Sequence, residues 1–406
     1  MRALLVSQVF APEPGAVGEH LFQATAELAK RGATVRVVTS RHGYDDPTLT
    51  FPAHEMMGGV EVLRVPWSSF GKSSVGHRIA GSAGFVLQST LRSLRGFKPD
   101  IVIVGTSPPL SSLVGKALAR IHRVPLLYWV MDVNPDQIVA LGRLSERHPA
   151  VIALRAWNNR IARTADHLVV LDDDMAVRMR AKGALADRMT VLPPWPLDDY
   201  IEPVEHAQNP FRAEHDLVGK RVVMFSGNLS TASPVTTFIE AARRVTHLQG
   251  LRIYVVGGGE GKKRLDAELA RDPIANVVSL PYEPLERLRF SLSAADVHLV
   301  SLGDAMRGIV HPSKLYGALA AGRPIIYLGP AASHIDRVVQ DHGIGWRVAH
   351  GDVDAAERLL ERVTVMPQHE LDALGKKARQ LAEHRFSKQR LCGGFCDVVE
   401  RVANAQ

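Results

Sequence analysis

The first forty residues decide the fold and read, from Met1 to Ser40, MRALLVSQVFAPEPGAVGEHLFQATAELAKRGATVRVVTS. Residues 3–9 form an apolar run with β-branched members, and residues 35–38 form a second. Prolines and glycines fill residues 11–18, and apolar residues then recur at helical spacing until Arg31-Gly32. This pattern predicts a strand, a glycine turn, a helix and a second strand. Strands this continuously apolar belong in a parallel sheet covered on both faces.

Further strand and helix patterns follow in both halves of the chain. The first half has apolar strand patterns at 101–104, 126–130 and 167–171 and a helical pattern at 113–120. The second half has strand patterns at 222–225, 252–256, 297–301 and 324–328 and helical patterns at 235–245 and 314–321. A proline-rich stretch at 191–210 separates the two sets and indicates a domain edge.

These patterns predict two Rossmann-like, doubly wound α/β domains that face each other across a cleft. We expect an N-terminal domain at 1–200 and a C-terminal domain at 211–387, with a helix at 388–406 packing back on the first domain. Ligands of such folds bind at the carboxyl ends of the parallel strands.

Composition excludes several other classes of protein. The chain has 406 residues, of which 46% are apolar and 22% charged, so it is neither disordered nor a collagen or coiled coil. It shows neither a secretory leader nor an apolar run of about 18 residues, which predicts a cytoplasmic protein. Cys392 and Cys396 lie four residues apart, as on one face of a helix, and we expect no structural disulfide.

The formal net charge of +7 is concentrated in one region, residues 62–131, called here the basic region. Its only acid is Asp100, whereas its nine basic residues are Arg64, Lys72, Arg78, Arg92, Arg95, Lys98, Lys116, Arg120 and Arg123. Aromatic residues and leucines alternate with these charges. This pattern suits either a helix on an anionic membrane surface or a core-facing helix with a solvated basic face. Nucleic-acid binding is disfavoured because no recognised module accompanies the charge.

Three glycine-rich segments are candidates for ligand binding. Gly15 and Gly18 lie in the first turn, where they allow either close approach to a phosphate or simple tight packing. The run Gly257-Gly258-Gly259-Glu260-Gly261 lacks the spacing of a dinucleotide fingerprint, so we interpret it as a tight turn beside the cleft.

The third segment, residues 307–324, reads RGIVHPSKLYGALAAGRP. Ser313 and Lys314 stand at the start of a helix made of small residues, where backbone N–H groups and a positive charge suit a diphosphate. Lys314 could neutralise charge on a leaving group. The alternative is an ordinary capped helix with a solvated lysine.

In these segments the chain resembles the retaining family 4 glycosyltransferases, whose fold is GT-B. The resemblance covers nearly the whole chain and is carried by eight segments in order: 14–18 with 28–32, 106–110, 131–136, 192–195, 225–229, 256–259, 281–284 and 312–314. The segments Ser107-Pro108-Pro109, Asp132-Val133-Asn134-Pro135-Asp136 and Ser226-Gly227-Asn228-Leu229 are most similar to the branch that builds bacterial surface polysaccharides.

The resemblance implies a nucleotide-sugar donor bound mainly in the second domain. By this resemblance, Gly227 and Asn228 face the diphosphate, the turn at Gly257 and Gly258 and the region of Tyr282 border the base, and Pro312, Ser313 and Lys314 meet the phosphates. Gly15 approaches from the first domain. Asp132 would orient a sugar or acceptor hydroxyl, although it could instead cap the following helix.

Two departures from the family pattern stand out. The positions of two family glutamates hold Ile309 and Gly317, neither of which can bind a hydroxyl through its side chain. The family's arginine and lysine on the diphosphate fall near Asn228 and Ser233-Pro234. Phosphate charge would then be met by Lys314 and helix N-termini, with Arg307, Arg264 or His311 as further candidates. A lone histidine near a helix start is as often structural.

The resemblance implies transfer of an amino or N-acetyl sugar from a donor such as a UDP-sugar. It further implies that the anomeric configuration is retained and that neither a cofactor nor a metal takes part. A glycan, a polyprenyl-linked acceptor or a small molecule would receive it, with the enzyme in the cytoplasm or peripheral on the inner face of the cell membrane. Residues Asp172-Asp173-Asp174 suit a helix cap better than a metal site. Two alternatives remain: a sugar-nucleotide epimerase of this fold and a non-catalytic sugar-nucleotide-binding subunit.

Overall fold

The computed structural model describes residues 1–13, 15–44, 46–68, 75–197 and 201–405, and within α2 it describes side chains only from residue 81 onward. Pro14, Lys72 and the domain edge at 198–200 therefore lie outside the described residues, as does the side chain of Arg78. The chain divides into two compact units. Unit 1 comprises Met1–Leu197, Gly308–His311 and Lys388–Gln406, and unit 2 comprises Asp198–Arg307 and Pro312–Ser387.

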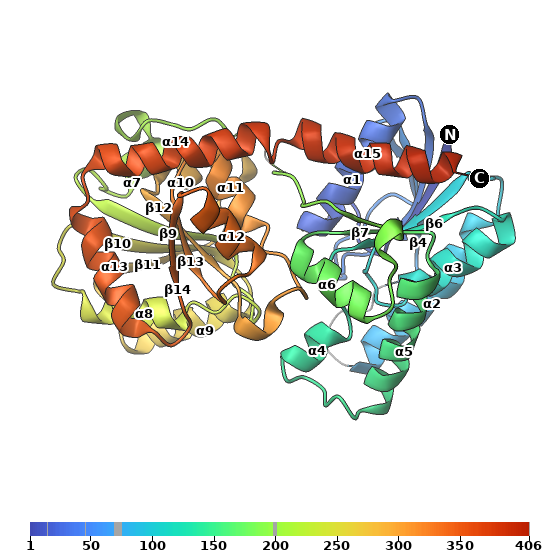
Figure 1. Cartoon of the computed structure of the whole chain (residues 1–406), viewed down its shortest axis with the longest axis horizontal. Helices are drawn as coiled ribbons and strands as arrows, with labels where there is room; N and C mark the ends of the chain where they lie inside the picture. Colours follow the sequence, from blue (N-terminus) through green and yellow to red (C-terminus); the bar gives the residue numbers. More distant parts are fainter. Residues whose placement is uncertain (14, 45, 69–74, 198–200, 406) are drawn as a thin grey trace. The chain divides into compact units, whose positions relative to one another are not determined.

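Within the described residues, unit 1 is built on an eight-stranded sheet with the order β3-β4-β2-β1-β5-β6-β7-β8 (Figure 1). Its strands pair in parallel, except that β3 runs antiparallel to β4. The strands are β1 (Arg2–Val6), β2 (Thr34–Ser40), β3 (His54–Met57), β4 (Val60–Val65), β5 (Ile101–Val104), β6 (Leu126–Val130), β7 (His167–Val170) and β8 (Met189–Val191). The helices are α1 (Ala16–Lys30), α2 (Val75–Ser93), α3 (Ser111–His122), α4 (Asp136–Ala140), α5 (Pro149–Thr164), α6 (Asp173–Ala181) and α15 (Lys388–Asn404).

Unit 2 is built on a fully parallel six-stranded sheet with the order β11-β10-β9-β12-β13-β14. The strands are β9 (Arg221–Asn228), β10 (Leu251–Gly258), β11 (Val277–Leu280), β12 (Val297–Ser301), β13 (Ile325–Leu328) and β14 (Gly345–Val348). The helices are α7 (Pro210–Glu214), α8 (Thr236–Arg244), α9 (Glu260–Arg271), α10 (Leu288–Ala294), α11 (Lys314–Ala320), α12 (His334–Asp341), α13 (Val353–Val365) and α14 (Gln368–His384). Short 3-10 turns occur at 186–188, 206–208, 285–287 and 304–306.

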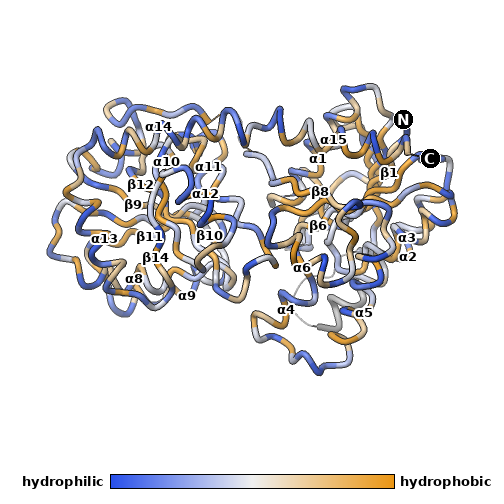
Figure 2. The backbone as a smooth tube through the Cα atoms, viewed as in Figure 1, coloured by the Kyte–Doolittle hydropathy of each residue, from blue (hydrophilic) through white to orange (hydrophobic). Residues whose placement is uncertain are grey.

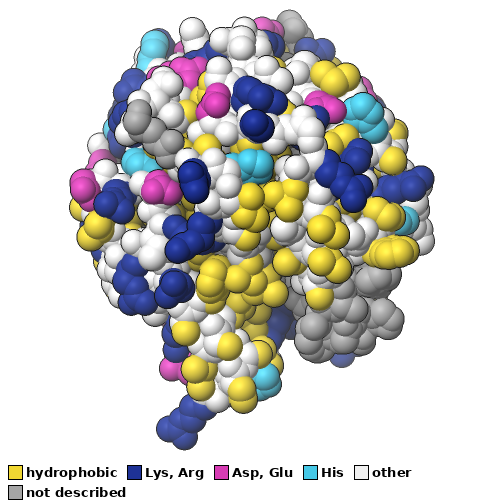
Figure 3. Space-filling model, turned by 90° about the vertical axis from the view of Figure 1, so that its right-hand side faces the viewer, with side chains coloured by type: hydrophobic (Ala, Val, Ile, Leu, Met, Phe, Trp, Pro, Cys, Tyr) yellow, Lys and Arg dark blue, Asp and Glu magenta, His cyan; other side chains and the backbone are white. Residues whose placement is uncertain are grey.

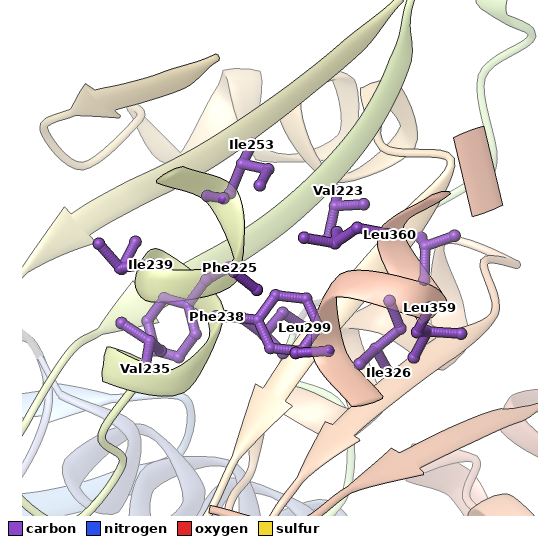
Figure 4. Packing of buried hydrophobic residues seen from close by; sticks show 14 of the residues in the cluster. Val223, Phe225, Val235, Phe238, Ile239, Ile253, Leu299, Ile326, Leu359 and Leu360 are labelled. Carbon is purple, nitrogen blue, oxygen red and sulfur yellow. The ribbon is translucent and has the colours of Figure 1, made fainter. Parts of the chain in front are cut away.

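The strands are buried because each sheet is covered by helices. Figure 2 shows apolar residues concentrated along the strands, and β5 and β6 are buried at every position. In unit 2, side chains of β9, β10 and β12 pack against α8 and α13, as Figure 4 shows for Phe225, Phe238 and Leu360. The prediction of two doubly wound α/β domains is therefore confirmed.

The C-terminal helix α15 is part of unit 1. Phe395 stacks on Trp129 of β6 with ring centroids 4.1 Å apart, and Arg31 of α1 pairs with Asp397 at 2.7 Å. Cys392 and Cys396 are free thiols, each donating to a backbone carbonyl of α1 at 3.7 Å. These cysteines serve helix packing, in line with the expectation of no structural disulfide.

Two basic residues of the basic region make contacts inside unit 1. Arg64 lies on β4 with its side chain only 1% exposed, where it pairs with Glu55 of β3 and donates to the carbonyl of Ala11 at 2.9 Å. Arg64 therefore cannot serve as an exposed charge of the basic region, because the antiparallel β3–β4 pair brings in an acid from outside that region. Lys116 is also engaged, since its ammonium donates to the carbonyl of Thr164.

Candidate functional site

In unit 2 the candidate donor residues meet at the carboxyl ends of β9 and β10. The two strands stay paired to their last residues, with Gly257 opposite Gly227 and Gly258 opposite Asn228. A Cβ atom on Gly257, whose φ is +135°, would collide with the carbonyl oxygen of Gly227. Glycine is therefore required where the two strand ends approach each other. The interpretation of this run as a tight turn agrees with its geometry.

Tyr282 lies beside this edge. A Cβ atom on Gly258 would be 2.6 Å from Cε2 of the tyrosine ring, so any side chain at this position would displace the ring. The side chain of Tyr282 is 59% exposed. An exposed aromatic ring at the carboxyl end of parallel strands is well placed to stack on a planar group.

Lys314 begins α11 and reaches across the same edge. Its Cε would lie 3.1 Å from a Cβ on Gly227, and its ammonium lies 5.3 Å from the ring centroid of Phe225. Burial lowers the pKa of Lys314 to about 8, because an ammonium loses hydration there. A half-buried cation beside a glycine strand end is suited to meet an anionic group.

The other residues of the 307–324 segment are divided between the two units. Ser313 takes the N-cap position of α11 and makes no side-chain capping bond, and Pro312 before it is buried. The guanidinium of Arg307 donates to the carbonyls of Ala331 and Ala332 at 3.4 and 2.7 Å, so it supports the turn before α12. Arg264, the other arginine candidate for phosphate, lies outside this segment on α9 and pairs with Glu260 at 2.6 Å.

His311 belongs to unit 1, together with Gly308, Ile309 and Val310. Its Nδ1 lies 2.8 Å from Oδ2 of Asp172, and both side chains are almost fully buried. The Ile309 carbonyl accepts the N–H of Val133 at 2.9 Å. The structure thus places His311 in a buried pair with a carboxylate of its own unit. The other oxygen of Asp172 accepts the N–H of Met175 and caps α6, as the sequence predicts.

Unit 1 has its own polar edge where β1, β5 and β6 end. Asp132 follows β6, and its N–H donates to the Thr106 hydroxyl at 3.2 Å. Burial raises the pKa of the Asp132 carboxyl to about 6. Asp132 precedes α4 by several residues and Pro135 stands at its N-cap, so capping does not explain Asp132. A half-buried carboxyl with a raised pKa is a candidate for contact with a substrate hydroxyl.

The two glycines of the first turn differ in their surroundings. Gly15 is the N-cap of α1 with φ of +150°, and a Cβ there would meet no atom within 4 Å. Gly18 lies against the backbone of Phe10, with a Cβ contact of 3.1 Å. Packing therefore explains Gly18, whereas the open space at Gly15 leaves room for a ligand.

Gln8 is a residue that the sequence interpretation missed. It follows β1 at the same edge, is 3% exposed, and donates through Nε2 to the Ser68 carbonyl. Within the described part of the chain its Oε1 is buried with no hydrogen-bond partner. A buried unpaired acceptor is costly, which makes Gln8 a candidate for contact with a donor group of a ligand. The signal in the sequence is the polar pair Ser7-Gln8 directly after an apolar strand.

A prediction follows for Asp132. Because its carboxyl keeps a proton in the folded protein up to about pH 6, it lowers stability at any pH above that value and has little effect near pH 4. We expect Asp132→Asn to raise the melting temperature at pH 8 and to show a smaller gain at pH 4.5. The exposed Asp187→Asn is the control and should change neither. An equal gain at both pH values would contradict the burial of this carboxyl.

Solved structures share this architecture over the whole chain. Sucrose-phosphate synthase (tll1590) from Thermosynechococcus elongatus aligns with a TM-score of 0.81 at 16% identity and covers 100% of both chains. Anabaena Alr3699/HepE, solved in complex with UDP-glucose, aligns with a TM-score of 0.73 at 16% identity and covers 98% of this chain and 99% of its own. The fold is the GT-B fold of glycosyltransferases.

Sequence comparisons narrow the class. Residues 15–195 match the glycosyl transferase 4-like domain, and residues 208–381 match the glycosyl transferases group 1 domain. Probable glycosyltransferase WbjE of Pseudomonas aeruginosa is 28% identical over 75% of this chain and 74% of its own. Putative colanic acid biosynthesis glycosyl transferase WcaI of Escherichia coli is 24% identical over 98% of this chain and 100% of its own. The chain belongs to the family 4-like glycosyltransferases of the GT-B fold.

Proposed function

We propose that this glycosyltransferase moves a sugar, an amino or N-acetyl sugar, from a UDP-sugar to a glycan or lipid-linked acceptor in bacterial polysaccharide synthesis, with retention of anomeric configuration. The observation that carries the proposal is the position of Lys314 against Gly227 of β9, which pairs with Gly257 of β10. Support for the donor class comes from Alr3699/HepE, which was solved with UDP-glucose, and support for the acceptor class from WcaI, named for colanic acid biosynthesis.

In this proposal the residues of unit 2 bind the donor. The glycine strand ends allow the diphosphate to approach the backbone, and the Ser313 hydroxyl and Asn228 lie at the same strand–helix edge. Tyr282 stacks on the base. As the bond between sugar and diphosphate breaks, negative charge grows on the leaving phosphate oxygen, and the Lys314 ammonium stabilises it. This step requires positioning and electrostatics from the protein and no nucleophilic side chain.

In unit 1 we assign the acceptor to the edge formed by Asp132 and Gln8. The half-buried Asp132 carboxylate accepts a hydrogen bond from a sugar hydroxyl, which orients the attacking group. No helix in the described residues is long and apolar enough to cross a membrane. We propose that the exposed part of the basic region, around Arg92, Arg95 and Lys98, brings unit 1 to an anionic membrane surface.

The test is to incubate the purified protein with a panel of UDP-sugars and sugar-bearing polyprenyl-diphosphate acceptors, and to determine the anomeric configuration of the product by NMR. Transfer with retained configuration is the expected result. Interconversion of the donor without transfer would indicate the epimerase alternative. Saturable donor binding with no turnover of any acceptor would indicate the non-catalytic alternative.

A further inference from the structure

An apolar groove lies on unit 1 between α2 and the start of α3. Its lining residues are Ala83, Val86, Leu87, Leu91, Leu110 and Leu113, together with Thr90, and its volume is about 380 Å³. The α2 residues follow the spacing of a single helical face. The Thr90 hydroxyl donates to the Val86 carbonyl at 2.7 Å, so this polar side chain is satisfied within its own helix.

The groove is open to its surroundings. Leu87 and Leu91 are 63% and 52% exposed, and Figure 3 shows hydrophobic side chains gathered in a band on this side of the molecule. Burying an exposed leucine contributes roughly 1.5–3 kcal/mol, so a contiguous apolar surface of this kind favours an apolar ligand or partner.

The backbone of Trp67 is held against α2, the helix that lines most of the groove. The Gln88 side chain donates to the Trp67 carbonyl at 2.8 Å and accepts the Trp67 N–H at 3.3 Å. Gly84 allows this approach, because a Cβ there would collide with the Trp67 carbonyl oxygen. Trp67 is 69% exposed. An exposed tryptophan is typical of side chains at a lipid–water boundary.

The charge around the groove is positive. Arg92, Arg95 and Lys98 are exposed at the end of α2 and just beyond it. From residue 62 to residue 99 the sequence contains no acidic residue. An apolar groove beside exposed cations is complementary to a hydrocarbon chain attached to an anionic headgroup.

The α3 end of the groove adjoins the acceptor edge. Leu110 is the N-cap residue of α3, and the loop before it is tied to that edge. The Gln8 N–H donates to the Ser107 carbonyl at 3.0 Å, and Thr106 accepts from the N–H of Asp132. A chain held in the groove would therefore extend from a headgroup close to these residues.

We infer that this groove binds the hydrocarbon chain of a lipid-linked, diphosphate-bearing acceptor. The inference rests on the proposed function for its biological role and deepens it by naming the acceptor class. A single chain fits the size of the groove, which lies at the lower end of the roughly 300–1,000 Å³ typical of small-molecule sites. A partner helix, with a diameter of about 10–12 Å, is less well suited to it.

The test uses geranylgeranyl diphosphate below its micelle concentration as the probe, with inorganic diphosphate as the headgroup alone, and follows binding by calorimetry. We expect saturable binding of the lipid probe that is at least tenfold tighter than that of diphosphate. Ala83→Leu fills the groove with apolar volume and should weaken binding of the lipid probe at least tenfold. Leu87→Ser combined with Leu91→Ser should do the same, whereas Ile152→Ser, a similarly exposed residue on α5, should not.

Binding of the lipid probe by Ala83→Leu as tight as by the wild type would overturn the inference, because nonspecific adsorption to the leucines would then explain it. Association with phosphatidylglycerol vesicles without saturable binding of the probe would also overturn it and would leave only a membrane surface. Because binding is measured without turnover, probe binding without sugar transfer would count against the proposed function alone. Transfer to soluble acceptors without probe binding would count against the groove alone.

Discussion

Lys314→Ala is expected to lower the turnover number for sugar transfer by more than tenfold while leaving the fold intact. The Lys314 side chain lies against Gly227, and its ammonium lies near the ring of Phe225, where the diphosphate of the donor is proposed to bind. Charge that develops on a leaving phosphate is stabilised there in a partly dehydrated environment, and a single such interaction typically contributes about 3–4 kcal/mol to the transition state. Turnover should be measured with saturating donor.

The pH dependence of Lys314 provides a second measurement on the same residue. Since burial lowers its pKa to about 8 in the free protein, the charged form disappears as pH rises through that value, and kcat/KM of the wild type for the donor should fall above pH 8. Lys314→Arg keeps a cation at every accessible pH and should lose this alkaline limb even if its turnover number is lower. Lys263→Ala, an exposed lysine on α9, is the control. Unchanged turnover in Lys314→Ala would remove Lys314 from the mechanism.

Gly257→Ala is expected to abolish donor binding and to destabilise unit 2. The methyl group would collide with the Gly227 carbonyl, and a φ of +135° is accessible almost only to glycine. Strained backbone of this kind costs about 1–3 kcal/mol, and relief of the collision requires the ends of β9 and β10 to separate. Binding of UDP and the melting temperature are the two measurements.

Gly317→Ala is the matched control, because it lies in a helix of the same unit and its Cβ would make an ordinary 3.6 Å contact with Leu292. We expect it to bind UDP as the wild type does and to melt no lower. If Gly257→Ala bound UDP with unchanged affinity, the paired strand ends would not be part of the donor site.

Local sequence patterns predicted much of the fold. The strands at 101–104, 126–130 and 297–301 have the predicted bounds, because each is a continuous apolar run that a two-sided parallel sheet requires. Among the elements of the described residues, the patterns missed five strands and several helices; the missed strands are β3, β4, β8, β11 and β14. His54–Met57 is an edge strand with exposed and half-buried positions, so burial imposes no clear apolar run on it.

For the candidate site, the sequence predicted which segments contribute residues, but it did not predict which side chains contact them. The sequence predicted the glycines at the ends of β9 and β10 and the lysine at the start of α11. Each of these positions reflects local backbone geometry or a helix end. The sequence did not show that Gly258 gives room to Tyr282, nor that Gly18 packs against Phe10. Such contacts join residues distant in sequence and depend on strand order.

By itself, therefore, the sequence determined the class of fold and the glycine–lysine elements of the proposed donor site, since these depend on periodicity and local conformation. Only the tertiary structure decided which side chains are available. It paired Arg64 with Glu55 and His311 with Asp172, both buried. It also left Leu87 and Leu91 exposed in a groove. Whether a charge is neutralised or a leucine is covered depends on contacts between segments distant in sequence. Local sequence patterns do not predict those contacts.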